Sequence, residues 1–232
     1  MILMPQMRGF AGGSSGAKTI ELVHTESNAS FLNDVTSATY TGCNLGTPAS
    51  DRDIFITCAA MTGYDYTEVV SVDVGGVAAT KLYDIYHTVD GDWRPHLSFW
   101  KARVPSGTTA DVTFTTGLST EFHGPCMGLY RAIGFTGLDD SDEHAIPDGG
   151  GGAMMAVSGA EGGAILACSF ERNGSGFDWT NVTKDFQADT NTSDHASVAS
   201  RLDLLSTATY YPIVQSKNTG AVFLSAAAIA IS

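Results

Sequence analysis

Hydrophobic and polar residues alternate most clearly in residues 67–116, and this segment predicts two β-hairpins. In residues 70–74, valines at every second position alternate with a serine and an aspartate, which is the period of a strand with one buried face. Gly75-Gly76 follows and supplies two residues that adopt positive φ at little cost, as a tight hairpin turn requires. We therefore expect residues 77–82 to return as the second strand of this hairpin.

The second hairpin is predicted to end at residue 116. The odd-numbered positions 97–103 are Leu, Phe, Lys and Arg, and alternation places them on one face of a strand. Residues 105–107, Pro-Ser-Gly, have the residue types of a turn, and residues 111–116 form the returning strand.

Strand-forming runs recur through the rest of the chain, at residues 18–24, 36–43, 54–60, 125–135, 153–158, 163–170, 209–216 and 221–231. No helical period is longer than about two turns, and roughly a dozen strands are expected. The fold class predicted is therefore all-β, a single antiparallel β-sandwich of jelly-roll type over residues 18–232. Residues 136–152 are expected to be a long loop, and residues 194–205 a strand or a short helix.

The same patterns predict a buried core. Its expected members are Ile54, Ile56, Val70, Val72, Val74, Phe99, Val112, Phe114, Leu129, Ile133, Leu166 and Leu224.

Residues 1–17 have a different character and are predicted to be an arm outside the domain. The arm is apolar at Ile2, Leu3, Met4, Met7 and Phe10, and residues 12–16 form a glycine- and serine-rich hinge. Exposing these apolar side chains to water gains nothing, so we expect the arm to pack on a neighbouring subunit or another protein. The alternative is that it folds back on its own sandwich.

Composition and charge narrow the function classes. Only 16% of the residues are charged and 26 are glycine, which favours short strands and turns over helices. The net charge of −13 argues against a nucleic-acid partner, which needs clustered lysine and arginine. No membrane partner is expected, because the longest apolar run, residues 226–231, is far shorter than the roughly 20 residues of a spanning helix. No signal peptide is recognised, so synthesis in a cytoplasm is expected.

Sets of catalytic residues are not found in the sequence, and no enzyme activity is expected. The six histidines have no HxH or HExxH spacing, and no GxSxG segment has the strand-turn-helix context of a nucleophile. The four cysteines, Cys43, Cys58, Cys126 and Cys168, have no CxxC spacing and are interpreted as small buried residues, with disulfides left open.

Two groups of residues have the chemistry of a binding site. Asp139, Asp140, Asp142 and Glu143 offer clustered carboxylates to a calcium ion, or are simply a solvated acidic loop. No other cofactor is expected.

The second group consists of loop tryptophans beside polar residues, which suit stacking on a sugar ring. It comprises Asp90, Asp92, Trp93 and Trp179. The alternative is that both tryptophans cover the ends of the core.

Four segments, in order, carry a resemblance to a known family. They are ASDRDIFIT (49–57), VVSVDVGGVAAT (69–80), SFWKARVPSGTTADVTFTT (98–116) and CMGLYRAIGFTGL (126–138). They resemble the small β-sandwich virion-associated proteins of tailed phages, prophages and gene-transfer-agent-like elements. The resemblance implies a virion protein made in the host cytoplasm, and its motifs are mostly turn chemistry.

The functional expectation that follows is a structural component of a phage-like virion. A head decoration, spike-base or tail accessory protein would dock on a symmetric lattice of capsid or tail proteins, as a homo-oligomer with a trimer as the first guess. The alternative is a carbohydrate-binding adhesin that recognises a host surface glycan, and a hydrolase comes third.

Overall fold

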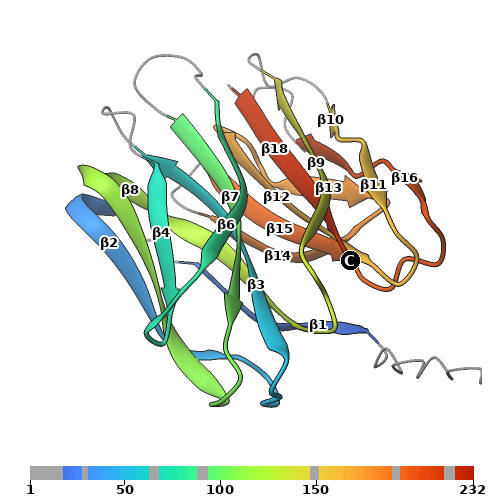
Figure 1. Ribbon diagram of the computed structural model, residues 1–232. Helices are drawn as coiled ribbons and strands as arrows, with labels where there is room; N and C mark the ends of the chain where they lie inside the picture. Colours follow the sequence, from blue (N-terminus) through green and yellow to red (C-terminus); the bar gives the residue numbers. More distant parts are fainter. Residues whose placement is uncertain are drawn as a thin grey trace, which may run out of the picture.

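The computed structural model describes residues 18–27, 31–62, 68–87, 94–146, 152–189, 194–216 and 223–232. Within these residues the secondary structure consists of strands joined by turns, and no helix is long and apolar enough to cross a membrane. The predicted all-β class is confirmed, and several antiparallel sheets pack together as in a β-sandwich (Figure 1).

The first half of the chain forms one eight-stranded sheet, with β5, β4, β8, β3, β7 and β6 in that order and β1 and β2 also paired to β8. Its strands are β1 (Thr19–Ser27), β2 (Phe31–Asn44), β3 (Arg52–Thr62), β4 (Val69–Val74), β5 (Val77–Ala78), β6 (Thr80–Tyr86), β7 (Arg94–Arg103) and β8 (Thr109–Ile133).

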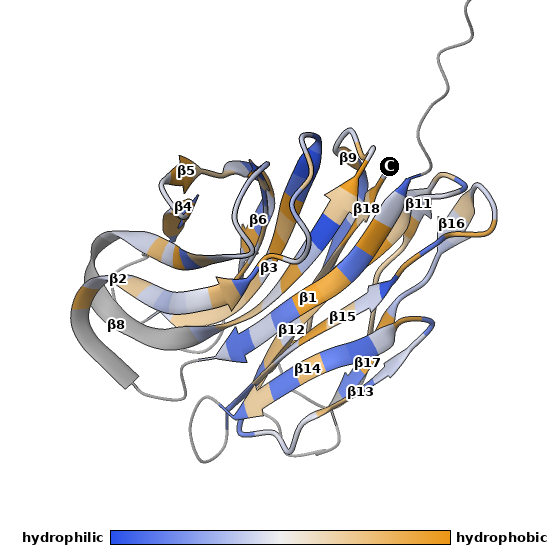
Figure 2. Cartoon of the chain, turned by 90° about the horizontal axis from the view of Figure 1, so that it is seen from below, coloured by the Kyte–Doolittle hydropathy of each residue, from blue (hydrophilic) through white to orange (hydrophobic). Residues whose placement is uncertain are grey.

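Strand β8 is long enough to belong to two layers. Residues 109–123 pair with β2 and residues 112–116 with β4, whereas residues 122–133 pair with β3 and residues 126–133 with β1. Figure 2 shows β2 and β8 curving together away from β3. The sheet thereby folds over its own buried side chains, which include Ile56, Trp100 and Phe114.

The second half forms a five-stranded sheet, in the order β14-β15-β12-β18-β9, and two small sheets, β10-β17-β13 and β11-β16. Its strands are β9 (Leu138–Ile146), β10 (Gly152–Met154), β11 (Val157–Gly159), β12 (Ala164–Arg172), β13 (Phe177–Thr180), β14 (Thr183–Asp189), β15 (His195–Arg201), β16 (Ala208–Tyr210), β17 (Ile213–Ser216) and β18 (Phe223–Ile231).

The two halves pack face to face. Phe55, Phe99 and Tyr130 from the first half meet Leu166 and Phe170 from the second in one continuous hydrophobic cluster. A third cluster lies on the other side of the five-stranded sheet, beneath the small sheets. Strands β3 and β18 are consequently buried along their whole length, because each has a core on both faces.

Apart from β5 and the β11–β16 pair, the two halves have the same strand order. In the first, β1-β8-β3-β7-β6 faces β2-β8-β4; in the second, β9-β18-β12-β15-β14 faces β10-β17-β13. The contacts between the halves follow the same correspondence: β3 lies on β12, β7 on β18, β8 on β15, β1 on β14 and β6 on β9. This is the set of contacts that a two-fold relation between two similar units produces.

Most of the predicted core is confirmed, and two of its members are corrected. Val70 is 44% exposed and Ile133 is only half-buried. The reason for Val70 is a register shift between Val69 and Ser71 in the pairing of β4 with β8. The irregularity turns Val69 inward in its place, and Val69 is fully buried.

Residues 136–152, expected to be a long loop, mostly form a strand. Residues 138–146 are β9, which pairs with β18 from Leu224 to Ile231. Strand β18 is apolar except for Ser225 and is buried throughout, so its backbone needs a partner on this side, and β9 supplies it despite its acidic side chains.

Candidate functional site

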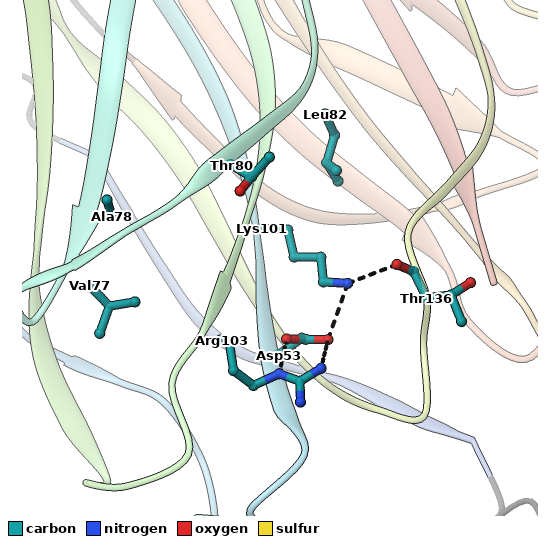
Figure 3. A pocket seen from close by; sticks show the side chains of 8 residues that line it. All are labelled: Asp53, Val77, Ala78, Thr80, Leu82, Lys101, Arg103 and Thr136. Atoms are coloured by element: carbon teal, nitrogen blue, oxygen red, sulfur yellow. Dashed lines mark hydrogen bonds and ion pairs between the residues drawn. The ribbon is translucent and has the colours of Figure 1, made fainter.

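An open groove of about 440 Å³ lies on the first half, beside the β4–β5 hairpin. It is lined by Asp53, Val77, Ala78, Thr80, Leu82, Lys101, Arg103 and Thr136 (Figure 3). The lining comes from the start of β3, from β5, β6 and β7, and from the turn before β9.

Strand pairing brings two cations onto one carboxylate in this groove. Asp53 lies directly opposite Arg103 in the β3–β7 pair, and Lys101 follows on the same face two residues away. Arg103 donates from Nε to Asp53 Oδ1 at 2.5 Å and from Nη2 to Oδ2 at 3.0 Å, while Lys101 Nζ lies 3.3 Å from Oδ2. Lys101 also donates to the carbonyl of Thr136 at 2.9 Å.

The electrostatic result is a locally positive groove on an acidic chain. The Asp53 side chain is only 2% exposed, whereas the Arg103 side chain is 54% exposed. The hydrogen bond with Asp53 raises the pKa of Arg103. Within the lining, two cations face one carboxylate and leave one positive charge, with the hydroxyls of Thr80 and Thr136 nearby. The negative charge of Asp51, outside the lining, also acts on Arg103. The groove therefore suits a carboxylate from outside.

The hairpin that forms one wall confirms the predicted turn, but its returning strand is shorter than expected: residues 77–78 pair with β4, and residues 80–86 continue as β6 along β7. Gly75 and Gly76 have φ of 63° and 88°. The N–H of Gly76 donates to Asp73 Oδ1 at 2.7 Å, and the N–H of Gly75 donates to the carbonyl of Asp111. The turn is thus fixed to β8 as well as closed on itself.

Beside the groove, Arg52 ties two loops together from a fully buried position. Burial and the charge of Arg131 lower the pKa of Arg52, although a guanidinium remains charged in proteins. All five of its N–H groups donate to carbonyls: Nε to Val104 at 2.6 Å, Nη1 to Leu45 and Gly46 at 3.2 and 3.0 Å, and Nη2 to Ser106 and Gly107 at 2.7 and 2.9 Å. The role of this arginine is therefore structural.

The acidic residues proposed for calcium project from β9 and do not converge on one point. Each carboxylate instead accepts a hydrogen bond: Asp139 from Ser232 Oγ at 2.6 Å, Asp140 from the N–H of Ser158 at 2.7 Å, Asp142 from the N–H of Ala156 at 2.6 Å, and Glu143 from the Tyr83 hydroxyl. Asp140 and Asp142 thus satisfy backbone donors of the segment around β11. Calcium at these residues remains a prediction.

Trp179 is the one tryptophan of the glycan hypothesis that the structure describes. It lies on β13, packs against the cluster under the small sheets, and donates from Nε1 to Ser197 Oγ at 2.8 Å. The indole N–H of Trp179 is therefore already hydrogen-bonded within the protein. Asp90, Asp92 and Trp93 lie outside the described residues, as do the arm residues Ile2, Leu3, Met4, Met7 and Phe10. A glycan site remains a prediction.

Sequence reasoning missed a polar cluster of partly exposed residues around the buried His96. Lys81 Nζ lies 2.7 Å from Asp84 Oδ2 and 3.2 Å from Glu68 Oε2. His96 Nδ1 accepts the N–H of Val69 at 3.3 Å, which leaves Nε2–H directed at Asp84 Oδ2 at 3.4 Å. The hydrogen bond from His96, followed by those from Lys81, lowers the pKa of Asp84. The β6–β7 register and the packing of the start of β4 against β7 bring this cluster together, and no local spacing encodes either of them.

The four cysteines are buried, as expected, and all are free, a point that the sequence left open. Burial raises the pKa of Cys58 to about 12. No protein-family model, no curated protein sequence and no solved structure matches this chain.

Proposed function

We propose that the chain is a structural component of a phage-like virion that docks through the groove of Figure 3 on a symmetric lattice of capsid or tail proteins. One observation carries the proposal. Every residue that lines the groove, apart from Leu82, belongs to one of the four segments of the family resemblance. Segments spread over residues 49–138 thus contribute to one surface feature, which is what a shared docking site requires.

The groove's chemistry supports docking on an acidic partner surface. Arg103 holds Asp53 with two hydrogen bonds and still exposes half of its side chain, so it is placed to accept a carboxylate from a neighbouring protein. An interface of this type gains specificity and association rate from charge complementarity more than it gains affinity. Repetition on a lattice then supplies avidity.

Incorporation into particles tests the proposal. Tagged protein is expressed in cells that produce the particles, and purified particles are analysed by mass spectrometry. We expect the wild type to be incorporated, Arg103→Glu to be depleted, and the control Arg201→Glu, on β15 of the other half, to be incorporated normally. Absence of the wild type from particles contradicts the virion function, whereas normal incorporation of Arg103→Glu contradicts only the groove.

Two finer features belong to the same proposal. The strand order β1-β8-β3-β7 facing β2-β8-β4-β5 supports a jelly roll in the first half. We also propose that residues 1–17 pack on a neighbouring subunit in a closed homo-oligomer, with a trimer as the first assignment. Deletion of residues 1–16 should leave the unfolding temperature near that of the wild type and abolish oligomers in light scattering. Oligomers that survive the deletion contradict the role of the arm.

A further inference from the structure

Three side chains with metal-binding atoms meet at the edge between β1 and β2. His24 and Glu26 project from β1, and Cys43 lies near the end of β2. Their ligand atoms, a ring nitrogen, a carboxylate oxygen and Sγ, all lie within 4.8 Å of one another. His24 Nε2 and Glu26 Oε2 are 3.0 Å apart.

Backbone irregularities in both strands create this meeting. The pairing of β1 with β8 shifts register between Leu22 and His24, and the pairing of β2 with β8 shifts between Tyr40 and Cys43. Gly42, inside the second shift, has φ of 68°, and its N–H donates to Asp111 Oδ1 at 2.9 Å. Bulges of this kind redirect side chains and are frequent beside functional sites.

The donor set matches zinc. Zinc takes sulfur at about 2.3 Å and nitrogen or oxygen at about 2.0–2.2 Å, so tetrahedral ligands lie about 3.4–3.6 Å from one another. The three atoms need to move only a few tenths of an ångström to a little over 1 Å to satisfy this geometry. A hollow of about 190 Å³, lined by Glu26, Ser27, Thr39, Tyr40 and Thr41, adjoins the cluster and has room for a fourth, exchangeable ligand.

We propose that His24, Glu26 and Cys43 bind one zinc ion, with the fourth coordination position directed to this hollow. His24 and Glu26 are partly exposed and give the ion access from solvent, while Cys43 lies buried beneath them. On binding, the zinc–sulfur bond replaces the S–H bond of Cys43, and its proton passes to solvent. The hydrogen that His24 Nε2 shares with Glu26 is exchanged through solvent to Nδ1, which frees the Nε2 lone pair, and two bonds to the ion then replace the His24–Glu26 hydrogen bond.

Glu68, Asp84 and His96 form a second cluster of metal-binding side chains, but this cluster is not suited to a metal ion. There the ammonium of Lys81 already occupies the position of a cation. The hydrogen on His96 Nε2 also cannot move to Nδ1 without breaking the hydrogen bond that Nδ1 accepts from the N–H of Val69. In the described part of the chain, the ion-pair partner of Glu26 is His24, and no lysine or arginine fills the centre of the β1–β2 cluster.

Zinc and cobalt titrations test the proposal on chelator-treated full-length protein. Calorimetry should show one zinc per chain, and cobalt should give a near-ultraviolet thiolate-to-metal charge-transfer band. Cys43→Ala should abolish the band and weaken zinc binding by more than the roughly 10–100-fold seen when outer-shell partners are lost. Cys126→Ala, a buried thiol in another core, is the matched control and should keep both signals.

His24→Ala keeps the test decisive if Cys43→Ala fails to fold, because the His24 side chain is partly exposed. The His24→Ala protein should fold normally and show no heat of zinc binding in calorimetry. The proposal is overturned if the wild type shows no submillimolar zinc binding, if the cobalt band survives in Cys43→Ala, or if His24→Ala binds zinc as the wild type does.

Discussion

Replacement of Arg52 by methionine should be among the most destabilising single changes in the chain. The substitution keeps an unbranched side chain of similar length but removes all five hydrogen bonds to the loops before β3 and after β7. At a net contribution of about 0.5–1.5 kcal/mol each, these bonds are worth about 2.5–7.5 kcal/mol. The methionine variant no longer buries a charge, and this offsets part of the lost hydrogen-bond energy. We therefore expect the free energy of unfolding to fall by about 3–5 kcal/mol.

Urea and thermal unfolding monitored by circular dichroism measure this loss. For a chain of this length, about 2–4 °C accompanies each kcal/mol, so the unfolding temperature should fall by roughly 6–20 °C. The unfolding temperature of Arg52→Lys should lie between those of the wild type and Arg52→Met, since lysine keeps the charge but has three donors. Arg201→Met is the control: it removes a guanidinium 5.0 Å from the Tyr210 ring and should cost less than about 1 kcal/mol. An Arg52→Met protein within 1 kcal/mol of the wild type would refute the five-bond account.

Three further changes test the fold. Gly76→Val has open space for its side chain but requires a β-branched residue at φ of 88°, so it should cost about 1–3 kcal/mol; an unchanged melting temperature would count against the turn. Phe114→Ala, at a fully buried position, should cost about 3–5 kcal/mol in urea unfolding, and normal stability would show that this core is not tightly packed. The pKa of Asp84 is lowered by His96 and Lys81, so its stabilisation is present above about pH 4 and is lost as the pH falls through its folded pKa. Asp84→Asn should therefore flatten the fall in stability between about pH 5 and pH 2, and an unchanged slope would contradict the role of this cluster.

Local alternation predicted the positions of the strands in residues 67–116, because the period of a strand is short, but it predicted their pairing only at the Gly75-Gly76 turn. The second predicted hairpin is wrong: in the described residues β7 pairs with β3 and β6, whereas residues 111–116 of β8 pair with β2 and β4. Alternation also placed Lys101 on the same face as Arg103, which the groove confirms. Alternation fails where a bulge shifts the register, as at Val70. It fails too at β9, whose acidic side chains suggested a loop although its backbone completes an apolar sheet.

The candidate groove could be predicted only in its parts. The motifs singled out Asp53 and the Gly75-Gly76 turn, but the pairing of Asp53 with Arg103 depends on the register of β3 against β7, fifty residues apart. The five-bond role of Arg52 likewise depends on loops that only the folded sheet brings together. The repeated strand order could not be predicted from the sequence, because the halves share their topology and little sequence. They match only at short segments, such as Thr80-Lys81 at the start of β6 and Thr183-Lys184 at the start of β14.

The repeated strand order places the equivalent of a homodimer interface inside a single chain. Two separate units with this contact would dissociate on dilution, whereas here the short connection between β8 and β9 holds them at a high effective concentration. Because the two halves belong to one chain and differ in sequence, their outer faces can carry different residues. One chain can therefore carry the groove lined by Lys101 and Arg103 on one half and different chemistry on the other, which two identical subunits could not.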